Sequence, residues 1–146
     1  MSVQANILNL LRDLQRDLKM SYLFISHNLS VVRYMSTVTS VMYLGRIVEC
    51  ADTQRLFVRP AHPYTKSLIA ALPALGGRLA SPTLLGEAPD PHYPPPGCRF
   101  HTRCPQGPVV RPDRESCMTV DPKLDPTGEG QSVACHFPLK GTGSAT

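Results

Sequence analysis

The chain has 146 residues, and its 15 Lys and Arg against 11 Asp and Glu give a formal net charge of +4. This length suits one ordinary domain and argues against two full domains. A charge so small and dispersed argues against a nucleic-acid partner, because nucleic-acid-binding proteins usually carry a concentrated basic face. No apolar run approaches the roughly 20 residues that cross a bilayer, and no secretory signal pattern is present, so we expect a cytoplasmic protein.

The composition changes along the chain. All 15 Pro lie from Pro60 onward, and four of the five Cys follow Gly97. Residues 1–59 can therefore form regular helices and strands, whereas most of the remainder is expected to be irregular, because proline removes backbone donors and restricts the backbone. An irregular segment rich in Cys needs a cross-link or a metal to replace a large hydrophobic core.

The first 35 residues show three patterned segments. Apolar residues recur at three- and four-residue spacings over residues 3–18, which predicts an amphipathic helix of about four turns. The apolar run at 22–26 predicts a short buried strand, and the polar residues 26–28 at its end are expected to open to solvent. Residues 31–35 predict a short helix.

The next segment carries the signals of a hairpin and two helices. Apolar runs at 38–44 and 47–49 flank Gly45-Arg46, and a two-residue loop with Gly first predicts a type II′ hairpin. Asp52 or Thr53 can cap a helix that Pro60 ends. A second helix is expected from Pro63 through Leu72, because proline suits the first helical turn. Helices and strands that alternate in this way are typical of an α/β fold. One buried strand and a hairpin, however, cannot form a sheet that is covered on both faces. We therefore expect part of a larger domain.

Four segments in order carry a family resemblance. They are SVQANILNLL at 2–11, FISHNLSVV at 24–32, VMYLGRIVE at 41–49 and HPYT at 62–65. Together they resemble the ATP-binding subunits of bacterial oligopeptide and dipeptide ABC importers, over about residues 2–138. The resemblance implies the C-terminal fragment of a P-loop NTPase (ABC ATPase) domain followed by an irregular cysteine-rich extension.

The resemblance also divides the chain. It implies the C-terminal part of the ATPase domain at 1–59, an HPY-type extension with a Pro-rich spacer at 60–97 and a four-cysteine metal-binding segment at 98–138. The composition of residues 139–146 predicts a disordered tail. The part at 98–138 is called the cysteine segment below.

By resemblance, the complete subunit binds ATP with Mg²⁺ and couples its hydrolysis to peptide transport. It would work with two membrane permease subunits and a second ATPase subunit, peripherally on the cytoplasmic side of the bacterial membrane. No G-x-x-x-x-G-K-[ST] motif occurs in the 146 residues, so the chain supplies no phosphate loop of this kind. The signature motif and the Walker B Asp are also missing. We expect the chain to be inactive as an ATPase by itself.

His27 is the candidate catalytic and nucleotide-binding residue. It follows the predicted strand, and ligands of open α/β sheets bind beyond the carboxyl ends of strands. By resemblance His27 is the switch histidine, whose imidazole contacts the γ-phosphate and helps to position the attacking water. From its position alone, a solvent-facing turn histidine is the favoured explanation, and it is the resemblance that favours the ligand role.

Four cysteines form the candidate metal site: Cys98, Cys104, Cys117 and Cys135. In a reducing compartment such a set favours metal ligation over disulfides, and four thiolates suit either tetrahedral zinc or a 4Fe-4S cluster. The spacing matches neither zinc ribbons nor ferredoxins. The resemblance favours the 4Fe-4S cluster, with zinc or free thiols as alternatives. A function of another class also stays open, a stand-alone metal-binding interaction module without nucleotide chemistry.

Overall fold

The computed structural model describes residues 3–72, 84–128 and 130–140, and the chain divides into two compact units, Met1–Thr37 and Val38–Thr146. The division between the units falls inside the predicted ATPase part at 1–59. The predicted domain boundaries stay predictions. No helix among the described residues is both long enough and apolar enough to span a membrane.

The first unit contains two helices joined by an extended stretch. Helix α1 (Val3–Leu18) confirms the predicted amphipathic helix, and none of its residues is buried. Helix α2 (Leu29–Met35) begins at the N-cap Asn28. The two helices meet at Tyr34, whose hydroxyl lies 2.6 Å from Asn9 Oδ1 and whose ring lies 4.7 Å below the Arg12 guanidinium.

The strand predicted at 22–26 is absent from the structure. This stretch has no regular secondary structure, and Leu23 and Ile25 are 92% and 89% exposed. The prediction was wrong because a strand is stabilised by backbone hydrogen bonds to a neighbouring strand. An apolar run alone does not supply that neighbour.

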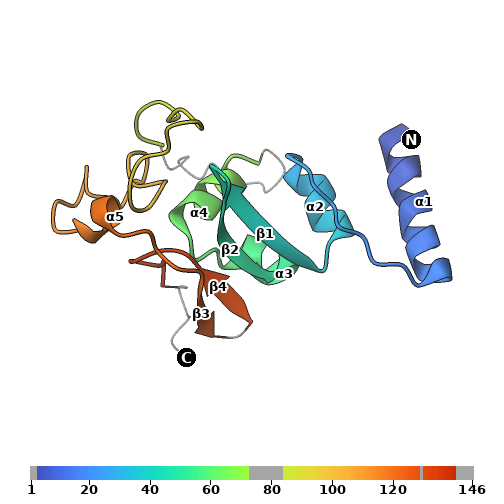
Figure 1. Ribbon diagram of the computed structural model, residues 1–146. Coiled ribbons are helices and arrows are strands. Elements are labelled where there is room, and N and C mark those ends of the chain that lie inside the picture. Colours follow the sequence, from blue (N-terminus) through green and yellow to red (C-terminus); the bar gives the residue numbers. More distant parts are fainter. Residues whose placement is uncertain (1–2, 73–83, 129, 141–146) are drawn as a thin grey trace. The chain divides into compact units, whose positions relative to one another are not determined.

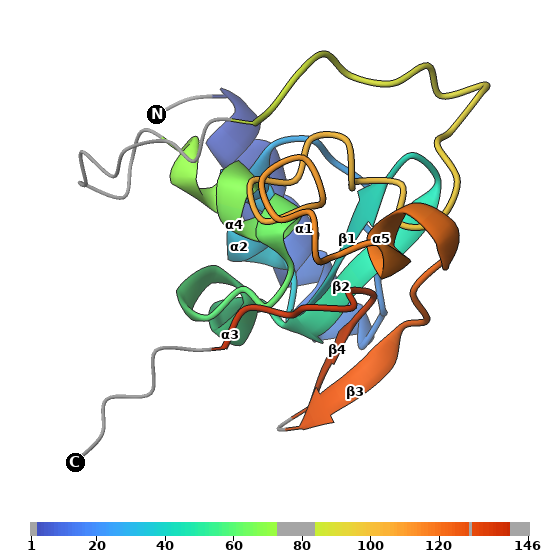
Figure 2. The same cartoon turned by 90° about the vertical axis from the view of Figure 1, so that its left-hand side faces the viewer.

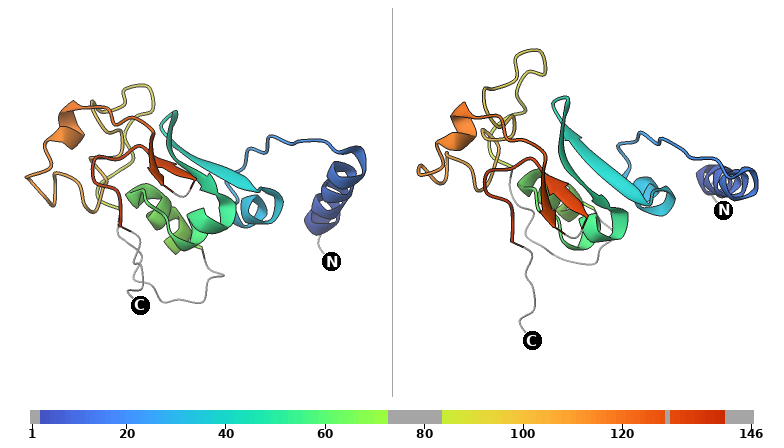
Figure 3. Two further views of the ribbon diagram at one scale, coloured as in Figure 1. Left: turned by 90° about the horizontal axis from the view of Figure 1, so that it is seen from below. Right: turned by 60° about the horizontal axis from the view of Figure 1, so that its bottom comes forward.

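The second unit is built on a four-stranded antiparallel sheet with the order β1-β2-β4-β3 (Figures 1 and 3). Strands β1 (Val38–Tyr43) and β2 (Arg46–Asp52) form the predicted hairpin. Its turn is Leu44-Gly45 in place of Gly45-Arg46. Both turn residues have positive φ, 44° and 76°, which is the type I′ pattern and corrects the predicted type II′ turn.

The cysteine segment supplies the other half of the sheet. Its regular elements are α5 (Ser116–Thr119), β3 (Asp125–Gly128) and β4 (Gln131–Val133). Strand β4 pairs with β2, where Glu49 faces Val133 and Cys50 faces Ser132. The expectation of an irregular segment is therefore wrong for its last part, which is joined by backbone hydrogen bonds to the predicted ATPase part.

Two helices lie on one side of this sheet (Figure 2). Helix α3 (Thr53–Val58) is capped by Asp52, whose carboxylate accepts hydrogen bonds from the backbone of Gln54 and Arg55, and this confirms the predicted cap. Helix α4 (Pro63–Ala70) begins with proline at its first turn, as predicted, but ends two residues before Leu72. The predicted stop at Pro73 lies outside the described residues.

Glu49 fixes the segment that links α3 to α4. Its carboxylate is fully buried and accepts hydrogen bonds from the backbone N–H of Ala61 at 2.7 Å, the backbone N–H of His62 at 2.9 Å and the side-chain amide of Gln131 at 2.6 Å. A buried carboxylate is tolerated when donors satisfy its oxygens. Glu49 therefore joins β2, β4 and the start of α4 at one point.

Candidate functional site

His27 lies in a turn whose shape is set by its two neighbours. Ser26 Oγ accepts a hydrogen bond from the Asn28 backbone at 3.0 Å, and Asn28 Oδ1 accepts bonds from Ser30 and Val31 at the start of α2. The imidazole is exposed between these anchored residues. The geometry suits a side chain that reaches an external ligand from a fixed backbone, and it equally suits an ordinary turn histidine.

The four predicted ligand cysteines lie near one another in the second unit. The Cys98 N–H donates to the Cys117 carbonyl at 2.9 Å. A Cβ on Gly97, whose φ is +66°, would lie 2.6 Å from that same carbonyl, so only glycine fits there. After burial, the neighbouring thiols Cys98, Cys104 and Cys117 all help to raise the pKa of Cys135. Four cysteines that are distant in sequence are thus gathered within electrostatic reach.

The environment of these thiols opposes their ionisation. Burial raises the pKa of Cys98 to about 11, and the neighbouring thiols Cys117 and Cys104 add to the increase. Burial likewise raises the pKa of Cys135 to about 12. Burial also raises the pKa of Cys104 and Cys117, whereas the Arg114 guanidinium acts in the opposite direction on both. Without a bound cation these groups remain protonated thiols at neutral pH.

The arrangement of donors bears on which metal could bind. All five cysteines are free. Among the described residues, no three His, Cys, Asp or Glu side chains are placed so that they could hold one metal ion. The zinc alternative needs ligands that converge on a single ion. The structure therefore gives no support to a preformed site for zinc or for an iron-sulfur cluster, although the donor set has the soft sulfur chemistry that either group requires.

Three contacts attach the cysteine segment to the hairpin. The Arg99 guanidinium donates to the Leu44 carbonyl in the turn. Arg46 at the start of β2 forms a 3.1 Å ion pair with Asp121. Phe100 is 1% exposed and packs against Tyr43 with ring centroids 5.2 Å apart. The thiols are thereby positioned by the hairpin.

Sequence reasoning missed the residues that organise this region. Phe100 packs against Tyr64 and His62 as well as Tyr43, and Glu49 holds His62 through its backbone. The one signal for Phe100 was an aromatic side chain between two cysteines. Glu49 had no local signal, because its donors lie far along the chain.

Comparison with known proteins shows which proteins this chain resembles. Residues 48–108 match the family described as oligopeptide/dipeptide transporter, C-terminal region. The chain is 49% identical over 138 residues to a probable peptide ABC transporter ATP-binding protein of Sinorhizobium fredii. Over most of its length the chain is therefore similar to peptide ABC transporter ATP-binding proteins. The match covers 92% of this chain and 37% of that relative.

Two further relatives give the same result. The di/tripeptide transport ATP-binding protein DppF of Pseudomonas aeruginosa is 43% identical over 137 residues, and the dipeptide transport ATP-binding protein DppF of Haemophilus influenzae is 43% identical over 136 residues. Each match covers 92% of this chain and 40% of the relative. The chain therefore spans about two fifths of the length of these members of the family.

The matched family region has a clear place in the structure. Residues 48–108 include most of β2, both α3 and α4, and the first two cysteines of the candidate site. Cys117 and Cys135 lie outside this region, and so does His27. The matched region therefore spans the predicted extension at 60–97 and parts of the two neighbouring segments.

Proposed function

We propose that this chain is the C-terminal part of an ATP-binding subunit that couples ATP binding and hydrolysis to peptide import. The observation that carries the proposal is 43–49% identity to peptide-transport ATP-binding proteins over 92% of the chain. The complete subunit would use ATP with Mg²⁺, pair with a second ATPase subunit and drive two membrane permeases from the cytoplasmic side. The alternative of a stand-alone metal-binding module is not favoured, because the identity extends across both units.

His27 is the residue to which we assign the chemistry of the nucleotide site. A neutral imidazole can accept a hydrogen bond from water and donate one to a phosphate oxygen, which suits contact with the γ-phosphate and the attacking water. The Ser26 and Asn28 hydrogen bonds would hold the backbone on both sides of it. The phosphate loop and the Mg²⁺ ligand would come from polypeptide that this sequence does not contain.

A chimera tests this function. The corresponding C-terminal part of the Haemophilus influenzae dipeptide transport ATP-binding protein is replaced by this chain, and dipeptide uptake is measured in cells that lack their own subunit. We expect uptake to be restored. The His27→Ala chimera should assemble normally but lose at least about tenfold of its ATPase rate, the scale of removing one positioned catalytic group.

The matched control is His92→Ala, which alters an exposed histidine of the second unit. The His92→Ala chimera should retain its ATPase rate. Failure of the unmodified chimera to restore uptake, although it is expressed and assembled, would contradict the proposed function. Equal ATPase rates in the His27→Ala and unmodified chimeras would contradict the role of His27 alone.

For the cysteines we propose a 4Fe-4S cluster with a structural role. A cluster binds one thiolate at each of four irons, so its ligands surround a volume and need not meet at a point as they do around zinc. The gathered thiols Cys98, Cys104, Cys117 and Cys135 supply that donor set. When bound, the cluster would supply cross-links between α5, the segment that follows β4 and the loop at Cys98 and Cys104.

Anaerobic purification tests the cluster. We expect brown protein with broad absorption near 400 nm and with iron and sulfide in equal amounts. Cys104→Ser should remove most of this absorption, whereas Cys50→Ser should leave it unchanged, because Cys50 lies on β2 outside the gathered set. Colourless protein with stoichiometric zinc, or an equal effect of both substitutions, would contradict the proposal.

A further inference from the structure

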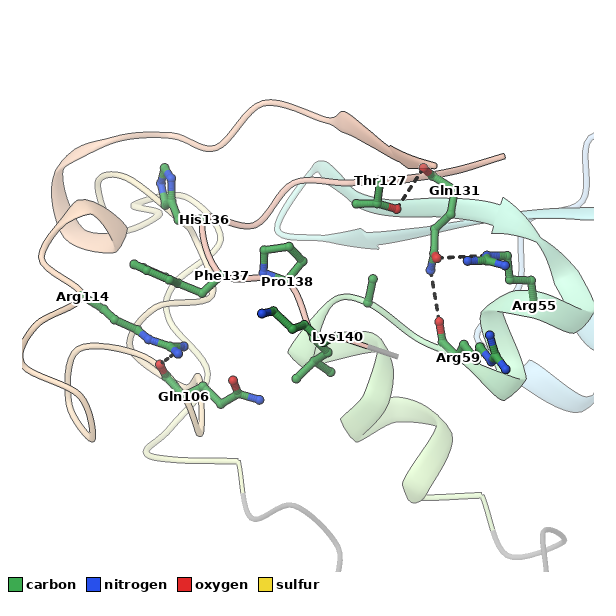
Figure 4. A pocket seen from close by; sticks show the side chains of 12 residues that line it. Arg55, Arg59, Gln106, Arg114, Thr127, Gln131, His136, Phe137, Pro138 and Lys140 are labelled. Carbon is green, nitrogen blue, oxygen red and sulfur yellow. Dashed lines mark hydrogen bonds between the residues drawn. The ribbon is translucent and has the colours of Figure 1, made fainter. Parts of the chain in front are cut away.

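A basic groove lies in the second unit. It encloses about 820 Å³ between α3, the loop that precedes α5 and the segment that follows β4. Its cationic residues are Arg55, Arg59, Arg114 and Lys140. No Asp or Glu is among the described residues that line it. Figure 4 shows Arg55 and Arg59 on one side, Arg114 on the other and Lys140 between them.

One side of the groove is ordered by a hydrogen-bond chain. The Gln131 amide nitrogen donates to the buried Glu49 carboxylate at 2.6 Å and to the Arg59 carbonyl at 3.2 Å. The side-chain carbonyl oxygen of Gln131 must then lie on the opposite side of the amide group. There it accepts a hydrogen bond from Arg55 Nε at 3.1 Å. Gln131 is 4% exposed. The Arg55 guanidinium is therefore held in one orientation before any ligand arrives.

The opposite side is ordered by different contacts. Arg114 Nη1 donates to the Gln106 carbonyl at 2.7 Å, and the guanidinium lies 4.3 Å from the centre of the Phe137 ring. The Leu139 N–H donates to the Ala61 carbonyl at 2.8 Å, which fixes the segment next to Lys140. Residues 137–139 add an apolar surface to the charged surface that the arginines and Lys140 supply.

We propose that this groove binds a phosphate-bearing organic ligand, with the phosphate at the guanidinium groups and the organic part against Phe137, Pro138 and Leu139. Guanidinium groups match phosphate oxygens in paired hydrogen bonds, and a phosphate carries enough oxygens and charge to engage more than one of them. Because Arg55 and Arg114 are already oriented, binding loses little side-chain entropy. This site goes beyond the proposed transport function, which requires no ligand here.

The same phosphate chemistry is offered by a soluble organic phosphate and by a lipid headgroup. Titration calorimetry of the 146-residue chain with glycerol 3-phosphate, against glycerol as the uncharged control, tests the soluble source. Sedimentation with phosphatidylglycerol-containing vesicles, against vesicles of phosphatidylcholine alone, tests the lipid source. We expect saturable binding in at least one of these two arms.

The variants decide whether the groove is the site. Arg59→Gln and Arg114→Gln should each weaken binding about tenfold, as expected for the loss of one charge-assisted contact. Arg59→Lys, which keeps the charge but loses the planar fork, should bind between wild type and Arg59→Gln. The control Arg111→Gln removes an equal charge three residues from Arg114, outside the groove lining, and should change affinity by less than about twofold.

Circular dichroism first establishes that each variant is folded. If Arg114→Gln unfolds because the Gln106 contact is lost, the exposed Arg59 decides the question alone. Binding in neither arm would overturn the proposal, and so would an equal loss in Arg111→Gln and Arg59→Gln. Vesicle binding that depends on Arg59, without glycerol 3-phosphate binding, would support the proposal with the lipid headgroup as the source.

Discussion

Glu49 carries more of the second unit's organisation than any neighbouring side chain, because three donors converge on its buried carboxylate. Replacing it by alanine leaves two backbone N–H groups and the Gln131 amide without their acceptor. We predict that Glu49→Ala lowers the free energy of unfolding by about 2–4 kcal/mol, the cost of unsatisfied buried polar groups. Urea unfolding monitored by near-ultraviolet circular dichroism measures the loss.

Glu49→Gln separates the charge from the acceptor geometry. It retains one carbonyl oxygen but turns an amide NH₂ toward a donor, so its loss of stability should fall between those of wild type and Glu49→Ala. Glu87→Ala removes an exposed carboxylate and should leave stability unchanged within about 0.5 kcal/mol. A Glu49→Ala protein as stable as Glu87→Ala would show that the buried contacts contribute nothing.

His62 gives the second unit a pH dependence with a definite sign. Burial lowers its pKa from 6.5 to about 4, and its Nδ1 accepts a hydrogen bond from the Tyr64 N–H at 3.1 Å. Below pH 6.5 the unfolded chain binds a proton that the folded one does not, so stability falls as the pH drops from 6.5 towards 4 and loses nothing more from this group below that. The lowered pKa of His62 corresponds to a loss of about 3 kcal/mol in the free energy of unfolding over this pH range.

Unfolding midpoints between pH 7 and pH 5 test this expectation. The near-ultraviolet signal should report the packing of Tyr43 and Tyr64, whose ring centroids lie 4.7 Å apart in the second unit. His62→Gln lacks the titrating group, so its midpoint should change less over this range than that of the wild type. A wild-type midpoint that stays constant from pH 7 to pH 5 would mean that the pKa of His62 is the same in the folded and unfolded chains, and would contradict this prediction.

Sequence patterns found the local residues of this structure and missed the distant ones. Asp52 and Pro63 were predicted because a cap and a first-turn proline depend on neighbours within one helical turn. The partners of Glu49 lie 12, 13 and 82 positions away. No periodicity or spacing reports such contacts, because they arise only when β4 joins the hairpin.

At the scale of elements, the hairpin turn does not carry the residue pair that its backbone conformation prefers. A type I′ turn needs positive φ at both central residues, which Asn-Gly adopts far more readily than Leu44-Gly45. We predict that Gly45→Ala lowers the free energy of unfolding by about 1 kcal/mol through backbone strain. A Cβ at this position would lie 3.6 Å from the Arg99 guanidinium, an ordinary contact, so crowding adds little.

Leu44→Asn is the matched variant, and it should change stability in the opposite direction to Gly45→Ala. Its side chain tolerates positive φ, so thermal unfolding should show an equal or higher midpoint than wild type. The contact between Arg99 and Leu44 uses the backbone carbonyl and is retained. A Gly45→Ala protein with the wild-type midpoint would contradict the strain that we assign to this turn.

The two strands that sequence reasoning missed show why short elements are hard to predict. Strand β3 contains Pro126 and lies at the edge of the sheet, where proline is tolerated, and β4 has three residues. Gly128 at the end of β3 and Gly130 just before β4 were a possible turn signal. The opposite error at 22–26 has the same origin, since pairing partners decide whether an extended segment becomes a strand.

At the scale of the whole molecule, the two units differ in how well they bury apolar surface. In the first unit α1 has no buried residue, and large apolar side chains such as Ile7, Leu10 and Leu18 are more than half exposed. The second unit contains the sheet, the aromatic cluster around Phe100 and the buried Glu49. Exposed apolar faces of this extent favour association. The 146-residue chain should therefore self-associate through its first unit.

Expression of residues 38–146 alone tests this difference between the units. We predict that this part is folded and monomeric, because its sheet, its helices α3 and α4 and its aromatic cluster all lie within it. The 146-residue chain should form larger species at the same concentration in size-exclusion chromatography with light scattering. Substituting the exposed Leu23 and Ile25 by Thr in the 146-residue chain should reduce this association while the near-ultraviolet spectrum stays the same. If residues 38–146 were unfolded while the 146-residue chain was folded, the stability of the second unit would depend on the first unit. That result would disprove the independence of the second unit.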